Sequence, residues 1–210
     1  MLLILARHGN TFNKGEKTYR VGNSNDLPLV EKGLAQAQTF AKALLEKNIK
    51  PVAVYCGPLQ RTRKFAEIIV SGLDLHELPI VDERLNELNY GVWAGLDDEA
   101  IREKVGSDFD GWEKHGRWPQ NSKWPETEKE IIRQVRSFAK DLAEKYKPED
   151  VVVAVSSSGK LRYFLKLIEN EFEDRIKSGS IKVGTGNACV IVCDRSKFEL
   201  IAWNINVEEL

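Results

Sequence analysis

The 210-residue chain lacks any apolar run of about 18 residues, the length that crosses a membrane as a helix. It also lacks a basic segment ahead of its first apolar run, so we expect no signal peptide. Its charges nearly cancel, because 31 Lys and Arg face 32 Asp and Glu for a formal net charge of -1. Without a positive surplus, the chain has no global attraction to nucleic acid or to an anionic membrane surface. We therefore predict no nucleic-acid or membrane partner, and any anion binding must come from local groups.

Cysteine is also scarce. The chain has Cys56, Cys189 and Cys193, an odd number in a protein too long to need a disulfide framework. This usage suits a reducing compartment, so we predict a cytoplasmic location. Cys189 and Cys193 stand four apart on one face of an expected strand, where buried thiols are expected rather than metal ligands. No other residues have metal-ligand spacing, and we predict neither a metal site nor a cofactor.

Apolar runs alternate with segments of helical periodicity along most of the chain. Thr127 and Glu130 have the spacing of a capping box and open the clearest helix. The polar stretch from Phe12 to Asp26 predicts a long loop, and long loops in compact domains tend to be functional. The expected strands are residues 2–6, 52–56, 80–81, 151–155, 188–193 and 198–203, the last two joined by a hairpin turn at 194–197. The expected helices are 30–47, 59–71, 97–104 and 127–146, with others around Phe109 and Trp112 and from Leu161 to Ile168.

Strands that alternate with helices indicate an α/β layered domain with a mostly parallel central sheet. The length suits one domain, residues 1–210. From Leu85 to Trp124 the periodicity weakens, and four of the five tryptophans fall in this segment. We treat about residues 94–125 as an aromatic-rich insertion, whose rings form either a small core, which we favour, or a cover that stacks on a substrate.

In parallel sheets, ligands bind beyond the carboxyl ends of the strands. The first expected strand ends there in Arg7-His8-Gly9, which on its own is either a functional strand end or a surface loop that carries Arg and His. We expect Gly9 to turn the backbone away at φ values that other residues avoid, leaving the imidazole exposed. Later strands lead to Arg61 and Arg63 near a helix N-terminus, where cations oppose the helix dipole unless an anion is bound. For Arg63 a solvated position is an equally good explanation.

Several of these segments resemble one known family. Arg7-His8-Gly9-Asn10-Thr11 resembles the Arg-His-Gly signature of the histidine phosphatase superfamily, the phosphoglycerate mutase-like proteins, in which Glu or Gln usually follows the glycine. Residues 56–62 resemble the family's Ser-x-Leu-x-Arg segment, and residues 84–95 are similar to its Glu-containing block. Residues 27–33 also have the family's pattern, and all four stand in the family's order. The resemblance implies a three-layer α/β/α sandwich.

The resemblance also implies roles for individual residues. A neutral imidazole is a nucleophile at physiological pH, so His8 would attack phosphorus and form a phosphohistidine that water hydrolyses. Arg7 and Arg61 would stabilise the charge on the phosphoryl oxygens, and Glu87 would protonate the leaving alkoxide. Asn13 is a candidate donor to the phosphate. The expected function is thus a metal-independent phosphomonoester hydrolase, a phosphatase, with a small phosphorylated substrate.

One expected group differs. Family members usually carry a second His after the strand at residues 151–155, and the corresponding position here is Ser157. Serine can still donate one hydrogen bond to phosphate, but it brings no charge, so the activity is expected to be reduced. This difference supports an alternative, a catalytically impaired relative that binds a phosphorylated ligand or partner. Phosphoglycerate mutase activity is less expected, and the sequence leaves open whether the chain forms a homodimer.

Overall fold

The computed structural model describes residues 1–195 and 197–210, and in them six strands form one sheet with the order β3-β2-β4-β1-β5-β6. The strand β1 lies near the middle and pairs in parallel with β4 and antiparallel with β5. The strands β2, β3 and β4 also pair in parallel, so the sheet is mostly parallel, as predicted. The strands are β1 (Leu2–Arg7), β2 (Ala53–Cys56), β3 (Ile80–Val81), β4 (Val151–Ser156), β5 (Ala188–Cys193) and β6 (Phe198–Ile205).

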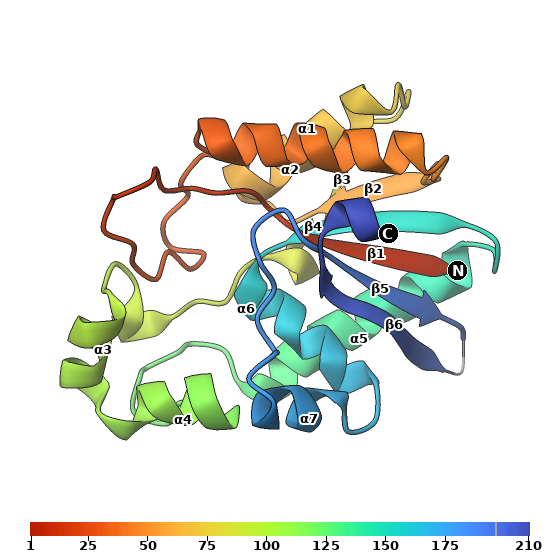
Figure 1. The fold of residues 1–210 in the computed structure, drawn as a ribbon. Helices are drawn as coiled ribbons and strands as arrows, with labels where there is room; N and C mark the ends of the chain where they lie inside the picture. Colours follow the sequence, from red (N-terminus) through yellow and green to blue (C-terminus); the bar gives the residue numbers. More distant parts are fainter. Residues whose placement is uncertain (196) are drawn as a thin grey trace.

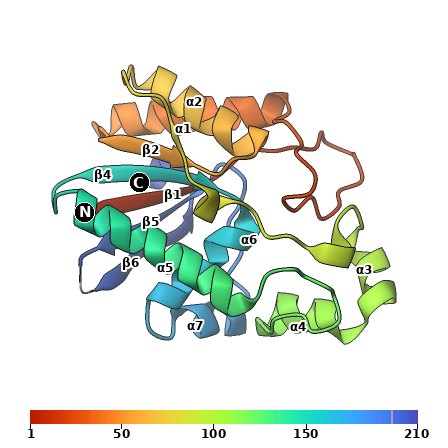
Figure 2. The same cartoon turned by 180° about the vertical axis from the view of Figure 1, so that it is seen from behind.

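Helices cover both faces of the sheet, which confirms the three-layer sandwich (Figures 1 and 2). One face packs against α1 (Glu31–Glu46) and α2 (Gln60–Gly72), with Phe40, Phe65 and Ile69 among the buried side chains. The other face packs against α5 (Glu128–Lys145) and against the segment that follows β4. Side chains along β1 point alternately to the two faces of the sheet, and both faces are covered by helices. Leu3 and Leu5 therefore enter the core on the α5 side, while Ile4 and Ala6 enter the core on the side of α1 and α2.

The segment after β4 departs most from the prediction. A single helix was expected to reach Ile168, but α6 (Ser158–Leu161) passes directly into the 3₁₀ helix η3 (Arg162–Leu167). A further helix, α7 (Glu171–Lys177), was not predicted, since its sequence is mostly charged and Phe172 is its buried residue. The strands β5 and β6 pair antiparallel as expected, although Ser196 of the predicted hairpin turn lies outside the described residues.

The helix α5 begins as its sequence predicts. The Thr127 hydroxyl accepts from the Glu130 backbone N–H, and the Glu130 carboxylate accepts in return from the Thr127 N–H, which completes the capping box. Over the described residues no helix is long and apolar enough to cross a membrane. The three cysteines are free and buried, and burial raises the pKa of each thiol to about 12. The expectation of buried thiols at Cys189 and Cys193 is confirmed.

The aromatic-rich segment lies beside the end of the sheet at which β1 ends (Figure 1). It contains α3 (Asp98–Val105) and α4 (Ser107–His115), and it is preceded by the short 3₁₀ helices η1 (Glu83–Leu85) and η2 (Gly91–Trp93). The ring of Trp93 is fully buried and lies 4.9 Å from Trp124 and 5.9 Å from Trp112 between centroids. These rings belong to the same core as α5, as expected of packing aromatics rather than of an open stacking surface.

Candidate active site

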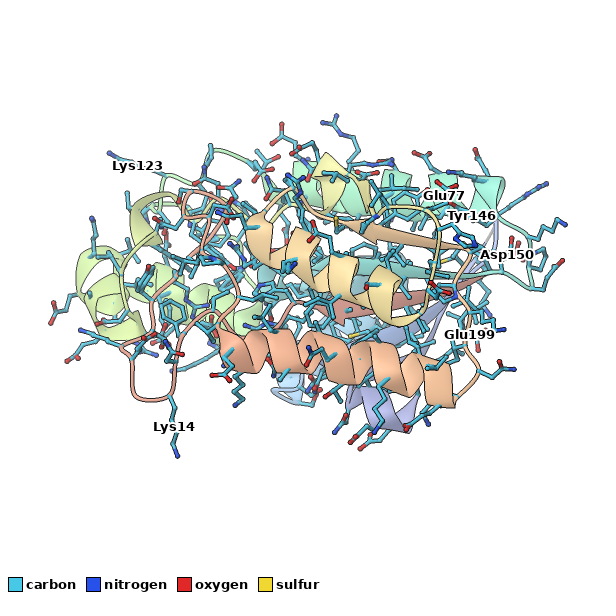
Figure 3. All side chains as sticks on the ribbon, turned by 90° about the horizontal axis from the view of Figure 1, so that it is seen from above. Lys14, Glu77, Lys123, Tyr146, Asp150 and Glu199 are labelled. Carbon is cyan, nitrogen blue, oxygen red and sulfur yellow. The ribbon has the colours of Figure 1, made fainter. Side chains whose placement is uncertain are left out.

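A cavity of 530 Å³ lies at the carboxyl ends of the parallel strands. Arg7 and His8 reach it from the end of β1, Arg61 from the first turn of α2, and Glu87 from the segment after η1. The long loop of residues 8–30, which contains no helix or strand, forms the outer wall. Figure 3 shows Lys14 of this loop at one end of the molecule, with Glu77 and Asp150 at the opposite end. The sheet therefore brings four of the predicted site residues to one place.

His8 is held as a neutral imidazole. Its Nδ1 lies 2.7 Å from the Gly9 carbonyl oxygen, which can only accept, so Nδ1 carries the proton. Its Nε2 lies 3.2 Å from Arg61 Nε, which can only donate, so Nε2 presents a lone pair. Burial lowers the pKa of His8 well below 6.5, and the positive charges of Arg7 and Arg61 lower it further. The nitrogen next to the arginines is therefore an unprotonated nucleophile at neutral pH.

Two expectations about Gly9 and His8 are wrong. Gly9 does not adopt a positive φ, and His8 is only 6% exposed. The glycine is needed for close approach instead, because a Cβ on Gly9 would overlap the backbone of Gly33 in α1. Gly33 is required in the same way, since its own Cβ would overlap the backbone of Asn10. The loop after β1 and the first turn of α1 thus pack backbone against backbone, directly after the buried His8.

Arg61 is 2% exposed, and its guanidinium is anchored by the long loop. Its Nη2 donates to the Gly22 carbonyl across 2.7 Å, and its Nη1 donates to the Asn25 carbonyl across 3.1 Å. Burial lowers its pKa, although an arginine remains charged. Within the described residues no carboxylate pairs with it, so its charge is available to an anion. Arg63, two residues later, is exposed and lies outside the cavity lining.

Arg7 is a second cation of the site, and it is partly buried. Its Nη1 donates to the Val183 carbonyl across 2.6 Å, and its buried Nε has no partner among the described residues. Burial also lowers the pKa of this guanidinium. Val183 belongs to the segment before β5, which the sequence analysis did not connect with the site. A buried N–H donor without a partner is costly, and a bound anion would satisfy it.

Glu87 is fixed by three backbone N–H groups. Its Oε1 accepts from Leu88 across 2.8 Å and from Lys160 across 3.1 Å, and its Oε2 accepts from Gly159 across 3.4 Å. Two of these donors belong to α6, so the carboxylate bridges the segment after η1 and the end of β4. A Cβ at Gly159 would overlap both Glu87 and the Tyr90 hydroxyl, which explains the glycine. Glu87 is 7% exposed and borders the cavity.

The two predicted substrate-binding residues lie less centrally. Asn13 borders the cavity but is exposed, and its Nδ2 donates to Glu16 across 2.8 Å. Ser157 precedes α6 and is 1% exposed, and its buried Oγ has no partner among the described residues. The neighbouring Ser158, rather than Ser157, borders the cavity. Over the part of the chain that the structure describes, no group of three or more His, Cys, Asp or Glu could hold a metal ion.

Sequence reasoning assigned no role to several other residues that line the cavity, among them Arg20, Tyr90 and Thr185. Thr185 donates to the Asn10 side chain across 2.7 Å and also accepts from Gln36, so it braces the loop after His8. The long loop carries the cations Lys14, Lys17 and Arg20 against the acids Glu16 and Asp26, but periodicity cannot place a loop residue in space.

Comparisons with known proteins find a matching family model and several relatives. A family model described as histidine phosphatase superfamily (branch 1) matches residues 3–206. The 2,3-bisphosphoglycerate-dependent phosphoglycerate mutase of Corynebacterium glutamicum is 36% identical over 107 residues, which span 50% of this chain and only 42% of that mutase. The corresponding mutase of Corynebacterium kroppenstedtii is 27% identical over 206 residues, or 87% of this chain and 82% of that protein.

Solved structures share the fold. Bacillus stearothermophilus YhfR superposes with a TM-score of 0.79 at 23% identity, covering 99% of this chain and 98% of that one. The phosphoserine phosphatase of Entamoeba histolytica, solved in complex with 3-phosphoglyceric acid, also has a TM-score of 0.79, at 18% identity, covering 100% of this chain and 99% of that one. At these identities the likeness concerns the fold alone.

Proposed function

The chain belongs to the histidine phosphatase superfamily, and on that premise we propose that it is a phosphomonoester hydrolase that acts through a phosphohistidine on His8. The observation that carries the proposal is the state of His8, a neutral imidazole whose Nε2 lone pair lies beside a buried arginine. Such a nitrogen can attack phosphorus without first losing a proton.

The proposed reaction has two steps. In the first, the Nε2 lone pair of His8 forms a bond to phosphorus, the bond from phosphorus to the ester oxygen breaks, and Glu87 gives a proton to the departing alkoxide. Arg7 and Arg61 stabilise the negative charge on the phosphoryl oxygens. In the second, water attacks phosphorus, its proton passes to Glu87, and the bond from phosphorus to Nε2 breaks. The products are an alcohol and inorganic phosphate, and the enzyme returns to its starting state.

A second candidate function rests on Ser157. The residue brings no charge to the site, and its hydroxyl is shielded from the cavity. A site with the arginines but a weakened second step would bind a phosphorylated ligand and turn it over slowly. Transfer between two hydroxyl groups of one molecule, the reaction named for the mutase relatives, is a third candidate that the low identity leaves as a proposal.

A rapid-quench experiment separates these functions. The enzyme is mixed with 4-nitrophenyl phosphate, denatured at alkaline pH and analysed by mass spectrometry for an acid-labile phosphoryl group on His8. We expect the phosphoenzyme and steady phosphate release in the wild type, neither in His8→Ala, and both in the matched control His76→Ala, since His76 is exposed and outside the cavity. Phosphate release that survives His8→Ala would refute the proposal.

Two broader properties are also proposed. We infer a cytoplasmic location because all three cysteines are free and buried rather than bridged. We treat residues 1–210 as one domain with an aromatic insertion at about 94–125, since the insertion's rings join the core beneath α5. A homodimer remains a prediction that sedimentation can test.

A further inference from the structure

A second cavity, of 230 Å³, adjoins the first, and we call it the side cavity. Both cavities are bordered by Arg7, Arg20, Tyr90 and Ser158. Because these residues face both spaces, one molecule can extend from His8 past Arg7 into the side cavity. The other residues that border it are Trp112, Glu113, Gly159, Arg162, Ile181 and Lys182.

Arg162 is the unusual residue of the side cavity, because it is only 4% exposed and yet has no acidic partner. Its Nη2 donates to the Trp112 carbonyl across 3.3 Å, and its Nε is buried with no partner. Within the described residues no carboxylate pairs with it. A buried guanidinium with an unsatisfied N–H is costly, and neither the fold nor the proposed reaction at His8 accounts for it.

The one acid of the side cavity is already engaged elsewhere. The Glu113 carboxylate lies 2.7 Å from Arg20 and 2.6 Å from Lys182, and Arg20 also pairs with Asp98 at 3.1 Å. Glu113 and Asp98 together balance Arg20 and Lys182, so the charge of Arg162, like that of Arg7, is left over. The side cavity carries a positive surplus that does not belong to the phosphoryl site.

The guanidinium of Arg162 is also held in place. Its Cζ lies 4.2 Å from the centre of the Trp112 ring, a stacking contact that fixes the guanidinium plane. A fixed plane of N–H donors suits the planar or tetrahedral oxygens of a carboxylate or a phosphate. Burial lowers the pKa of Arg162, but arginine remains charged, so an anion would meet a full positive charge.

We propose, on the basis of the phosphatase function above, that the side cavity binds a second anionic group of the substrate through Arg162, while Lys182 keeps the Glu113 carboxylate paired. The substrate would be a phosphomonoester whose leaving alcohol carries a carboxylate or a second phosphate. The phosphoryl group to be cleaved lies against His8, and the second anion lies beyond Arg7.

Three probes of equal chain length test this inference: propyl phosphate, its analogue with a terminal carboxylate, and its analogue with a terminal phosphate. We expect the wild type to prefer at least one charged analogue by about tenfold or more in kcat/KM, since hydrogen bonds to charged groups are the strong ones. In Arg162→Met that ratio should fall close to one. Whichever of the two charged probes has the higher kcat/KM identifies the second group as carboxylate or phosphate.

Two further variants keep the test decisive. Lys182 is 66% exposed at its side chain, so Lys182→Met threatens folding less than Arg162→Met does, and it should reduce the same ratio by a smaller factor. Arg102→Met is the matched control, because Arg102 lies on α3 outside both cavities and its loss should leave the ratio unchanged. A wild-type ratio near one, or a ratio that both cavity variants preserve, overturns the inference.

Failure of the proposed function is distinguishable from failure of this inference. If no probe is hydrolysed, affinities from calorimetry replace kcat/KM, and a preference for a charged probe that Arg162→Met abolishes sustains the side cavity while refuting the hydrolase. If all probes are hydrolysed at equal efficiency, the hydrolase stands and the side cavity has no such role.

Discussion

The Nε–H of Arg61 donates to Nε2 of His8 across 3.2 Å, so the cation that would bind the phosphoryl group also orients the nucleophile. The bond fixes the tautomer, with the proton on Nδ1 and the lone pair on Nε2. It also opposes protonation of Nε2, because a proton there would face the Arg61 charge. Because this lone pair accepts from Arg61 in the resting site, the Arg61 N–H must turn to a phosphoryl oxygen of the substrate before Nε2 can attack.

The first prediction concerns stability against pH. The folded pKa of His8 lies well below 6.5, its usual value, so between these two pKa values the unfolded chain binds a proton that the folded chain does not. Stability therefore falls as pH drops below 6.5, by at most about 1.4 kcal/mol per pH unit from this group. We expect His8→Asn to flatten that dependence by up to this slope, as measured by urea unfolding at a series of pH values.

The control for this measurement is His76→Asn, which removes an imidazole from an exposed position. It shows how much of the change comes from losing any histidine. The free energy of unfolding could show the same slope below pH 6.5 in the wild type and in His8→Asn. His8 would then titrate alike in the folded and the unfolded chain, contrary to its burial beside two arginines.

A second prediction concerns Glu87 and the leaving group. If Glu87 protonates the alkoxide, Glu87→Gln should lower kcat by about 10²- to 10⁴-fold for an alkyl phosphate. The loss should be much smaller for 4-nitrophenyl phosphate, whose phenolate leaves without a proton. Glu83→Gln is the matched control, since Glu83 is exposed in the adjacent η1 and outside the cavity. Equal losses for both substrates would assign Glu87 a positioning role instead.

The sequence was informative about His8, Arg61 and Glu87 for a physical reason. Each follows a strand, and in a parallel sheet the carboxyl ends of the strands meet at one edge. Strand and helix periodicity therefore predicted that these strand ends meet without any knowledge of the loops, whereas the role of Glu87 came from the resemblance to the family's Glu-containing block. Arg162 was not found, because its role depends on Trp112 and on the packing of the insertion, which no local pattern encodes.

Close backbone contacts were likewise beyond the sequence. Gly9 was expected to be a turn residue, and no sequence pattern connected it with Gly33. The structure shows that each glycine makes room for the backbone of the other segment, a contact between residues that lie far apart in the sequence. The helix α7 was missed because its charged sequence has little periodicity, and it packs through Phe172.

The third prediction uses the crowding at Gly159. A Cβ there would overlap Glu87 Oε1 and the Tyr90 hydroxyl, so Gly159→Ala should displace the Glu87 carboxylate. We expect a loss of about 1–3 kcal/mol in the free energy of unfolding and a lower kcat for alkyl phosphates. Thermal unfolding and steady-state kinetics measure the two effects.

Gly111→Ala is the matched control for that substitution. Gly111 lies within α4, and the nearest atom to an added Cβ is 3.6 Å away on Arg117, an ordinary contact. We expect a gain of up to about 1 kcal/mol, because alanine favours a helix interior over glycine. Equal stability changes in the two variants would show that the neighbours of Gly159 move aside freely.

The last prediction compares two adjacent serines. Ser156 Oγ donates to the Leu85 carbonyl across 2.7 Å, whereas the equally buried Ser157 Oγ has no partner among the described residues. Ser156→Ala should lose about 1 kcal/mol or more of stability, since it removes a made hydrogen bond. Ser157→Ala should leave the free energy of unfolding within about 0.5 kcal/mol of the wild type, because it removes an unsatisfied hydroxyl.

Activity then decides what Ser157 does. If its hydroxyl turns to the phosphoryl group during the reaction, Ser157→Ala should lower kcat/KM by about tenfold or more while stability is unchanged. Unchanged kcat/KM would remove Ser157 from the substrate-binding residues and leave Arg7 and Arg61 as the groups that stabilise the transferred phosphoryl. Because Ser156→Ala shifts stability and Ser157→Ala should not, the pair separates a structural hydroxyl from one kept free for the substrate.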